Sequence, residues 1–414
     1  MMNKPPMLTA QQALDHLLSH ANPVSESESI PMQEALGRVL AENVNSLVDV
    51  PPLDNTSMDG YAVRAADTSS AGQVLRIAQR IPAGSVGTQL EPGTAARIFT
   101  GAPVPPGADA VVMQEDCTLV EGTTSEVRVN ITPTAGQWIR CRGEDLSAGK
   151  TALSVGIFLR PQELGVAASA GLTHLNVKRR VKVAAFFTGD ELALPGEPLK
   201  PGGIYNSNRD TLLACLRSLG CEPTDLGIVP DRLDATRDAL RKASKDHDLI
   251  LTSGGVSVGE EDHIKPAVTA EGRLDLWQIA IKPGKPLAFG AVRKSNEPKD
   301  GEAWFIGLPG NPVSSFVTFL LFVRPFILKL QGRKVIPNPT YMMRADFDWL
   351  KADRRNEFLR VKLNQQGGLD LFPNQSSGVL TSASWGDGLV DCPPGQPIHR
   401  GDLVKYIPFD ALLT

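Results

Sequence analysis

The stretch DLILTSGGVSVGEED, residues 248–262, decides how the chain is interpreted. A short apolar run ends in paired glycines and small hydroxyls, and three consecutive carboxylates follow. A helix-like segment then begins at His263. This order predicts a strand, a loop of the size that binds phosphate, an acidic cluster and a helix.

The loop suits a phosphate-bearing ligand beside a cation. Glycines allow backbone N–H groups to approach an anion, and the N-terminus of the next helix adds a favourable dipole. The carboxylates would repel a bare phosphate, so they indicate a divalent ion such as Mg²⁺ between them and the ligand oxygens. The alternative is an ordinary glycine-rich turn with a solvated acidic end, and the loop taken alone favours that alternative.

Strand-like and helix-like segments alternate on both sides of this loop. The strand-like segments are 181–187, 224–229, 248–251 and 303–306, and the helix-like segments are 209–219, 234–245, 263–270 and 313–330. Such alternation predicts a mainly parallel sheet with helices on both faces. Ligands of such sheets bind at the carboxyl ends of the strands, so the loops that follow the strands form the candidate site.

Each of these loops is acidic or is shaped by glycine and proline. The first contains Glu191, the second Asp231 and the third the turn Ser253-Gly254-Gly255. The last reads GLPGNP, residues 307–312, where Asn311 is predicted to cap a helix and the residues before it to present backbone donors to a ligand. The loops together therefore predict a site for a phosphorylated ligand and a cation.

Two lysines lie in the segment IKPGKP, residues 281–286, between the third and last strands. Prolines follow both Lys282 and Lys285 and stiffen the backbone there. The lysines would supply the positive charge that an anion needs. A hairpin turn with exposed lysines is the alternative, and the prolines favour binding.

The N-terminal part of the chain has a different pattern. A helix is predicted from Thr9 to His20, a second short helix at 32–40, and an ordered loop at 48–63 that is either functional or a linker. Short apolar segments between proline- and glycine-rich turns predict a small inserted β domain at 72–135.

Two further stretches carry residues of chemical interest. A proline-rich segment presents Thr100 at a strand end, although a threonine there often only bonds its own backbone. Beyond residue 332 the chain is β-like again, with strands predicted at 341–347, 357–363, 369–373 and 402–407. The polar segment that contains Ser376 is by default an ordinary β-turn.

Composition limits the class of protein. The 414 residues provide for roughly two to four domains. A net charge of -4 argues against a nucleic-acid binder, and five scattered cysteines predict neither a zinc site nor disulfides. The N-terminus lacks the apolar region of a signal peptide, and the most apolar segment, 316–323, is expected to be too short to cross a membrane. A soluble cytoplasmic protein is expected.

Seven motifs occur together in one order. They are SMDGYA at 57–62, TGAPVP at 100–105, RGED at 142–145, TGDEL at 188–192, TSGGVSVG at 252–259, IKPGKP at 281–286 and LPGNPVS at 308–314. With them the chain resembles the molybdopterin molybdenumtransferase family, which comprises the bacterial MoeA proteins and the E domain of gephyrin. The resemblance extends in colinear order from about Leu8 to Phe409.

The resemblance implies a reaction and an architecture. Adenylylated molybdopterin and molybdate would give molybdenum cofactor and AMP, with Mg²⁺ or a similar divalent ion required. The subunit would have an elongated N-terminal domain (1–52 with 140–178), an inserted β domain (53–139), a molybdopterin-binding α/β domain (179–332) and a C-terminal domain (333–414) like a β-barrel. Two subunits would form a homodimer whose active sites are completed by the partner's N-terminal region.

The resemblance also implies three sets of functional residues. Those important for activity are Asp59, Thr100, Glu191, Asp231 and Asp262, of which Glu191 and Asp262 would hold the metal. The cradle for the pterin phosphate and nucleotide comprises Ser253, Gly254, Gly255, Pro309, Gly310, Asn311, Pro312 and Ser314. The molybdate contacts are Ser257, Lys282, Lys285, Arg360 and Ser376.

These sets agree with the chemistry of the reaction. Cleavage of a phosphoanhydride needs charge neutralisation, which a metal held by carboxylates supplies, whereas molybdate is a dianion that needs lysines and hydroxyl donors. One departure from the family pattern is His263, which follows Asp262 where a tyrosine is usual. It is interpreted as a helix-start residue, with an extra ligand as the alternative.

Two other functions are considered. A molybdopterin adenylyltransferase shares the α/β domain but would need only residues such as 178–332, so the N-terminal part with Asp59 and Thr100 favours insertion. A non-enzymatic scaffold of the gephyrin type is the second alternative. Molybdopterin adenylyltransferase and molybdoenzyme maturation factors are expected partners, and no contact with nucleic acid or membrane is expected.

Overall fold

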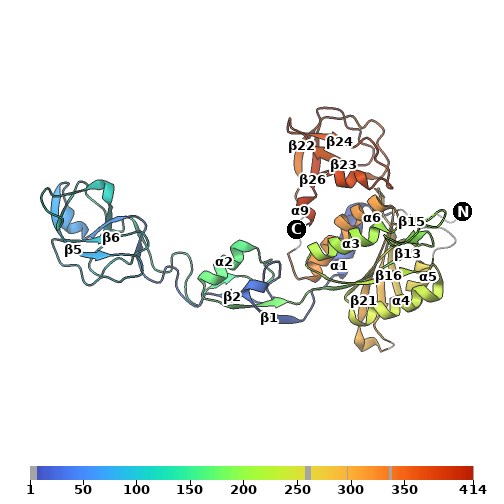
Figure 1. Cartoon of the computed structure of the whole chain (residues 1–414), viewed down its shortest axis with the longest axis horizontal. Helices are drawn as coiled ribbons and strands as arrows, with labels where there is room; N and C mark the ends of the chain where they lie inside the picture. Colours follow the sequence, from blue (N-terminus) through green and yellow to red (C-terminus); the bar gives the residue numbers. More distant parts are fainter. Residues whose placement is uncertain (1–6, 257–262, 296, 335–337, 414) are drawn as a thin grey trace. The chain divides into compact units, whose positions relative to one another are not determined.

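The computed structural model describes residues 7–256, 263–295, 297–334 and 338–413 (Figure 1). The chain divides into two compact units. The first unit comprises the described residues of 1–28, 37–39 and 178–414, and the second unit comprises 29–36 and 40–177. The four domain boundaries expected from the sequence stay a prediction.

A six-stranded mixed sheet organises the first unit, in the order β16-β13-β17-β21-β20-β18. Four strands are parallel: β13 (Lys182–Thr188), β16 (Glu222–Val229), β17 (Leu249–Ser253) and β21 (Glu302–Leu308). Two antiparallel strands, β18 (Gly272–Gln278) and β20 (Pro286–Arg293), extend the sheet and were not expected from the sequence. The predicted mainly parallel sheet is confirmed.

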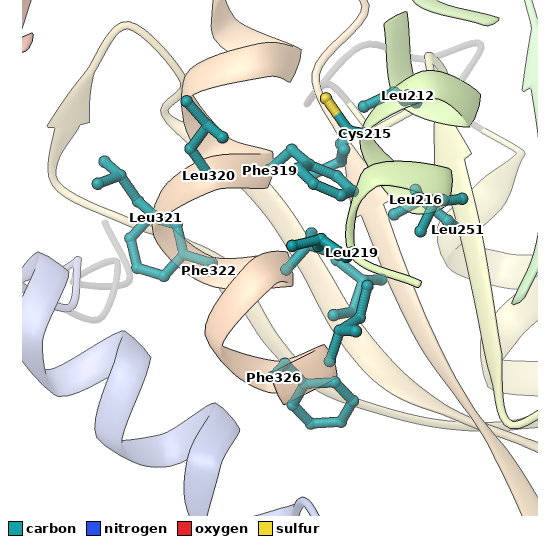
Figure 2. Packing of buried hydrophobic residues seen from close by; sticks show 14 of the residues in the cluster. Leu212, Cys215, Leu216, Leu219, Leu251, Phe319, Leu320, Leu321, Phe322 and Phe326 are labelled. Atoms are coloured by element: carbon teal, nitrogen blue, oxygen red, sulfur yellow. The ribbon is translucent and has the colours of Figure 1, made fainter. Parts of the chain in front are cut away.

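Helices cover both faces of this sheet because the strands are apolar on both faces. On β13, Val183, Ala185 and Phe187 belong to one buried cluster, and the alternate residues Ala184 and Phe186 belong to another. The first cluster includes residues of α3 (Ser207–Ser218) and of the helix at 312–330 (Figure 2). The second includes residues of α4 (Leu233–Asp246) and α5 (Ile264–Glu271). The predicted two-sided arrangement is confirmed.

The most apolar helix of the described chain is continuous from Pro312 to Leu330. It consists of α6 (Pro312–Thr318), a π-helical turn (Phe319–Val323) and α7 (Arg324–Leu330). Its 19 residues, with a mean hydropathy of 1.7, suffice by length and composition to cross a membrane, so the expectation of a short apolar segment is wrong on length. Of its most apolar 18-residue window, 89% is buried, which is typical of the core helix of a soluble protein. Figure 2 shows Phe319 of this helix beside Cys215 of α3.

The N-terminal helix α1 (Ala10–His20) is the predicted one. The Thr9 hydroxyl accepts from the backbone N–H of Gln12, and the Gln12 side chain accepts from that of Thr9, so the helix begins with a complete capping box. Buried Ala13 and Leu17 pack in the core of the first unit.

The C-terminal strands close into a five-stranded barrel, as expected. They are β22 (Tyr341–Ala345), β23 (Asn356–Leu363), β24 (Gly368–Leu371), β25 (Gly388–Cys392) and β26 (Leu403–Pro408). The barrel closes because β23 pairs with both β24 and β25. A short strand from the preceding domain, β19 (Ile281–Lys282), pairs in parallel with β23 and joins the barrel to the residues around the predicted lysines.

The second unit contains a curled six-stranded sheet in the order β7-β4-β6-β5-β9-β8, which confirms the small β domain. Its strands are β4 (Gly60–Val63), β5 (Gln73–Ile81), β6 (Thr94–Ile98), β7 (Ala110–Met113), β8 (Cys117–Leu119) and β9 (Glu126–Val129). The remainder includes β2 (Val44–Asn45), β11 (Thr151–Leu153) and α2 (Pro161–Ser169).

The short helix predicted at 32–40 is wrong. Only one 3₁₀ turn forms there, Met32–Glu34, and Gly37 follows with a φ of 74°. That left-handed conformation suits glycine and ends the turn. All five cysteines are free thiols in this structure.

Candidate functional site

A cavity of about 780 Å³ lies in the first unit at the carboxyl ends of the parallel strands. We call it the strand-end cavity. Its walls are the loops after β13, β16, β17 and β21, the turn at 282–286, the start of α3, and residues of the C-terminal domain that include Arg355 and Ser376. The volume is that of a small-molecule or cofactor site. This is where the alternation of strands and helices predicted a ligand.

The glycine loop after β17 is tightly packed against β13. Gly254 has a φ of 98°, and a Cβ atom there would lie 2.2 Å from the carbonyl oxygen of Thr188. Only glycine tolerates both the conformation and the close approach. Ser253 is buried, and its hydroxyl donates to the carbonyl oxygen of Pro309 at 2.9 Å. The glycine loop and the loop before α6 are thus held together.

Two asparagines at the start of α3 belong to the site and were missed by the sequence analysis. The Asn208 amide donates to the Ser253 hydroxyl at 2.9 Å and to the Gly310 carbonyl at 2.7 Å. Asn206 caps α3 through its oxygen, and its buried amide nitrogen has no partner among the described residues. Both asparagines could have been predicted from the sequence, because they lie at a helix start on the ligand side of the sheet.

Two carboxylates, those of Glu191 and Asp231, line the strand-end cavity. One carboxylate oxygen of Asp231, Oδ1, is buried and has no hydrogen-bond partner among the described residues. Burial raises the pKa of Asp231, as do the negative charges of Asp190 and Glu191, while His263 lowers it. The Thr188 side chain also lowers the pKa, but the net shift is upward, so these partners do not offset the burial of Asp231 and the negative charges beside it.

The chemistry of these two carboxylates fits a hard divalent cation, which prefers oxygen ligands. Asp231 and Glu191 both line the cavity. No cluster of three or more His, Cys, Asp or Glu side chains suited to a metal occurs among the residues that the structure describes. The predicted residues Ser257 and Asp262 lie outside those residues. His263 is described, at the N-cap position of α5, and its side chain makes no capping hydrogen bond.

Three cationic side chains also line the strand-end cavity. The Lys282 ammonium is 2.8 Å from Glu357 Oε1 and 3.6 Å from Asp353 Oδ2, so it reaches the cavity already paired with the C-terminal barrel. Lys285 also lines the cavity, and no ion pair to it occurs within the described ranges. Arg355, which the sequence analysis missed, is held there by Asp353 at 3.0 Å.

Arg360 does not line the strand-end cavity. It is 1% exposed, and its guanidinium donates to the Ser382 hydroxyl at 3.1 Å and to the Ser376 carbonyl at 3.4 Å. Burial lowers the pKa of Arg360 to about 10. Ser376 itself lines the cavity, so Arg360 supports that turn from beneath.

The remaining cradle residues also line the cavity. They are Gly254, Gly255, Pro309, Gly310, Asn311, Pro312 and Ser314. Asn311 is the N-cap residue of α6, as predicted, but its side chain makes no capping hydrogen bond. Its amide is therefore not committed to the helix start.

Asp59 and Thr100 lie in the second unit and contact each other. The backbone N–H and the hydroxyl of Thr100 both donate to Asp59 Oδ1 at 2.7 Å. These hydrogen bonds lower the pKa of Asp59. Thr100 therefore bonds this carboxylate rather than only its own backbone. Arg97, which was not predicted, donates to the Gly60 carbonyl at 3.1 Å and lies over the Phe99 ring.

The α/β domain and its glycine loop define the class of molybdopterin-binding proteins: residues 184–329 match the family model described as a probable molybdopterin binding domain. The flanking segments match the MoeA N-terminal region (domains I and II) at 8–171 and the MoeA C-terminal region (domain IV) at 343–409. The chain belongs to the molybdopterin molybdenumtransferase family.

Relatives and solved structures agree over nearly the whole chain. It is 41% identical to a molybdopterin molybdenumtransferase of Haemophilus influenzae, over 88% of this chain and 89% of that protein. It is 36% identical to one of Nostoc sp., over 90% and 86%. The crystal structure of a MoeA protein from Pyrococcus horikoshii OT3 superposes with a TM-score of 0.83 at 29% identity, covering 97% of this chain and 100% of that one.

Proposed function

We propose that this enzyme inserts molybdate into adenylylated molybdopterin, which yields molybdenum cofactor and AMP. One observation carries the proposal: the strand-end cavity combines oxygen groups suited to a divalent cation with ammonium and guanidinium groups suited to a dianion. Insertion requires both, because a phosphoanhydride is cleaved and an oxyanion is taken up. Relatives with this name cover most of the chain.

We assign roles to the residues of the cavity on this basis. Backbone N–H groups of Gly254 and Gly255 and of the turn before α6 would bind phosphate oxygens. Lys285 and Arg355 would hold molybdate, with the Ser376 hydroxyl as a further donor. Lys282, already bound by Glu357, would fix the barrel at the edge of the cavity.

A divalent cation such as Mg²⁺ would be held by Asp231 and Glu191, and when bound it neutralises charge on the phosphate oxygens. The orphaned oxygen of Asp231 supports this assignment. Asp262 would be a further ligand by family resemblance. We also propose a cytoplasmic homodimer in which Asp59 and Thr100 contribute to activity. Molybdopterin adenylyltransferase and molybdoenzyme maturation factors would be its partners.

The alternative functions are less well supported. An adenylyltransferase would need only the α/β domain, whereas this chain also matches the N-terminal and C-terminal MoeA regions. A scaffold of the gephyrin type would have no need for a carboxylate oxygen that is buried without a partner. Asp231 Oδ1 is such a carboxylate oxygen.

AMP release from adenylylated molybdopterin by the purified protein tests the function. Molybdate and Mg²⁺ are each omitted in turn, and release is expected only when both are present. The variant Asp231→Asn is expected to reduce AMP release. Asp234→Asn, on the exposed surface of α4, is its matched control. AMP release that is independent of molybdate would contradict insertion, and no release with retained substrate would support a binding protein.

A further inference from the structure

A second cavity, of about 540 Å³, lies at the opposite edge of the central sheet from the strand-end cavity. The C-terminal half of α4, the end of α5 and the end of β20 form its walls. The helices return from the carboxyl ends of the strands, and β20 ends where β21 begins, since Arg293 pairs with Glu302. This cavity is therefore separate from the site described above. We call it the basic cavity.

The basic cavity has an unusual charge. Five cationic side chains and one carboxylate line it, in a chain whose formal net charge is -4. The six residues are Arg237, Arg241, Lys245, Glu271, Arg293 and Lys294. Like charges this close repel one another unless an anion lies between them.

The single carboxylate holds two of the arginines in place. Glu271 accepts from the Nε atoms of Arg237 at 2.6 Å and of Arg241 at 2.9 Å, and from Arg241 Nη2 at 2.8 Å. A third guanidinium is fixed because Arg293 Nη2 donates to the Ala270 carbonyl at 2.7 Å. The guanidinium groups are thus positioned before any ligand binds, which lowers the entropic cost of binding.

The two lysines have no such partners. Within the described residues, no hydrogen bond or ion pair is made by the ammonium groups of Lys245 and Lys294. Lys294 does lower the pKa of Asp248, but that carboxylate is already bound by Arg179. Lys245 lies in the last turn of α4, where it offsets the helix dipole. That effect does not explain Arg293 and Lys294, which lie outside the helices.

We propose that the basic cavity binds a small molecule with adjacent phosphoryl groups, such as pyrophosphate or the polyphosphate of a nucleotide. Guanidinium groups bind phosphate oxygens in pairs, and free ammonium groups add charge without fixed geometry. A ligand with several adjacent negative charges matches these converging cations better than a ligand with one carboxylate group. The cavity volume is in the range of small-molecule sites. The inference does not depend on the reaction proposed above.

Calorimetric titration of the full chain with inorganic pyrophosphate tests the proposal. Lys245→Gln and Lys294→Gln are each expected to weaken binding by about tenfold, the effect of one charged contact. Lys242→Gln is the matched control, because Lys242 is exposed on the same helix but does not line the cavity. Affinity should fall as salt is added.

A further variant distinguishes pyrophosphate binding at the basic cavity from pyrophosphate binding at the strand-end cavity. Lys285→Gln is expected to leave the pyrophosphate site of the basic cavity unchanged. AMP release should be unaffected by Lys245→Gln and Lys294→Gln, so failure of either proposal can be recognised. Equal affinity in wild type, Lys245→Gln and Lys294→Gln would overturn the proposal, as would the absence of any binding. Tighter binding of a hexaglutamate peptide than of pyrophosphate would indicate an acidic protein partner instead.

Discussion

Two aspartates at opposite edges of the same sheet have opposite environments. Asp248, at the amino edge, is bound by Arg179 at 2.7 and 2.8 Å and by the backbone N–H of Lys182 at 2.9 Å. Burial raises the pKa of Asp248, but these hydrogen bonds outweigh it and the pKa is lowered. Burial likewise raises the pKa of Asp231, at the carboxyl edge, and there the pKa stays raised.

The comparison separates a carboxylate whose charge is stabilised by folding from one whose charge is disfavoured by folding. At the amino edge the chain itself supplies the partners of Asp248, so that carboxylate stabilises the folded state. At the carboxyl edge Asp231 Oδ1 has no partner among the described residues, and the raised pKa means that folding disfavours the ionised form of this group. Buried polar atoms without partners are a recognised mark of functional sites.

The largest effect is expected from Asp231→Asn. Loss of the carboxylate should reduce kcat for AMP release by roughly 100- to 1000-fold, the scale of one lost electrostatic contact to the transition state. The free energy of unfolding should stay the same or rise, because a partly buried charge that folding disfavours is removed. Urea unfolding and kinetics measured on one preparation check this. A large loss of stability would mean that Asp231 serves the fold as Asp248 does.

Asp248→Asn is expected to produce the reverse result. Removing the charge from a largely buried pair leaves Arg179 without its main partner, which should cost about 2–3 kcal/mol of unfolding free energy. Glu26→Gln is the control, since Glu26 contacts the same arginine at 3.2 Å but its side chain is 60% exposed. The control should cost less than about 1 kcal/mol. An equal loss in both variants would show that burial does not decide the effect.

A smaller effect should follow from Asn208→Ala. This variant removes the two hydrogen bonds that join the Ser253 hydroxyl and the Gly310 carbonyl. Each such bond contributes about 1 kcal/mol, and the loss of both corresponds to a rise of about 30-fold in KM for the adenylylated substrate. Thr211→Ala is the control, because that hydroxyl donates only to Ser207 within α3. An unchanged KM would mean that the loops hold their positions without Asn208.

The sequence predicted the residues at the carboxyl edge of the central sheet better than those at its amino edge. Alternating strands and helices place the loops with Glu191, Asp231 and Ser253 on one side, because parallel strands all end there. The antiparallel strands β18 and β20 were missed, since strand direction is set by pairing with distant segments and not by local composition. The basic cavity depends on the end of β20, and so it was missed with that strand.

Contacts between distant residues explain the remaining differences. Lys282 was predicted as an anion contact from its neighbours, but its ion pair to Glu357 exists only because β19 pairs with β23. Arg360 was assigned to the ligand, yet the fold buries it beneath the turn of Ser376. A local motif indicates which residue types are present, whereas only the tertiary structure determines which of them are already paired.

The smallest expected effect is the difference in pH dependence between the two aspartates. The lowered pKa of Asp248 gives stability that is complete above its unfolded pKa of about 4 and is lost as pH falls through the folded value. The raised pKa of Asp231 works in reverse: folding disfavours its ionised form, so its cost appears as pH rises above about 4. The difference in unfolding free energy between wild type and Asp248→Asn should therefore shrink at acidic pH. Any stability that Asp231→Asn gains over wild type should be largest near neutrality. If the unfolding free energies of the two variants, relative to wild type, changed with pH in the same direction, the two edges of the sheet would not differ in this respect.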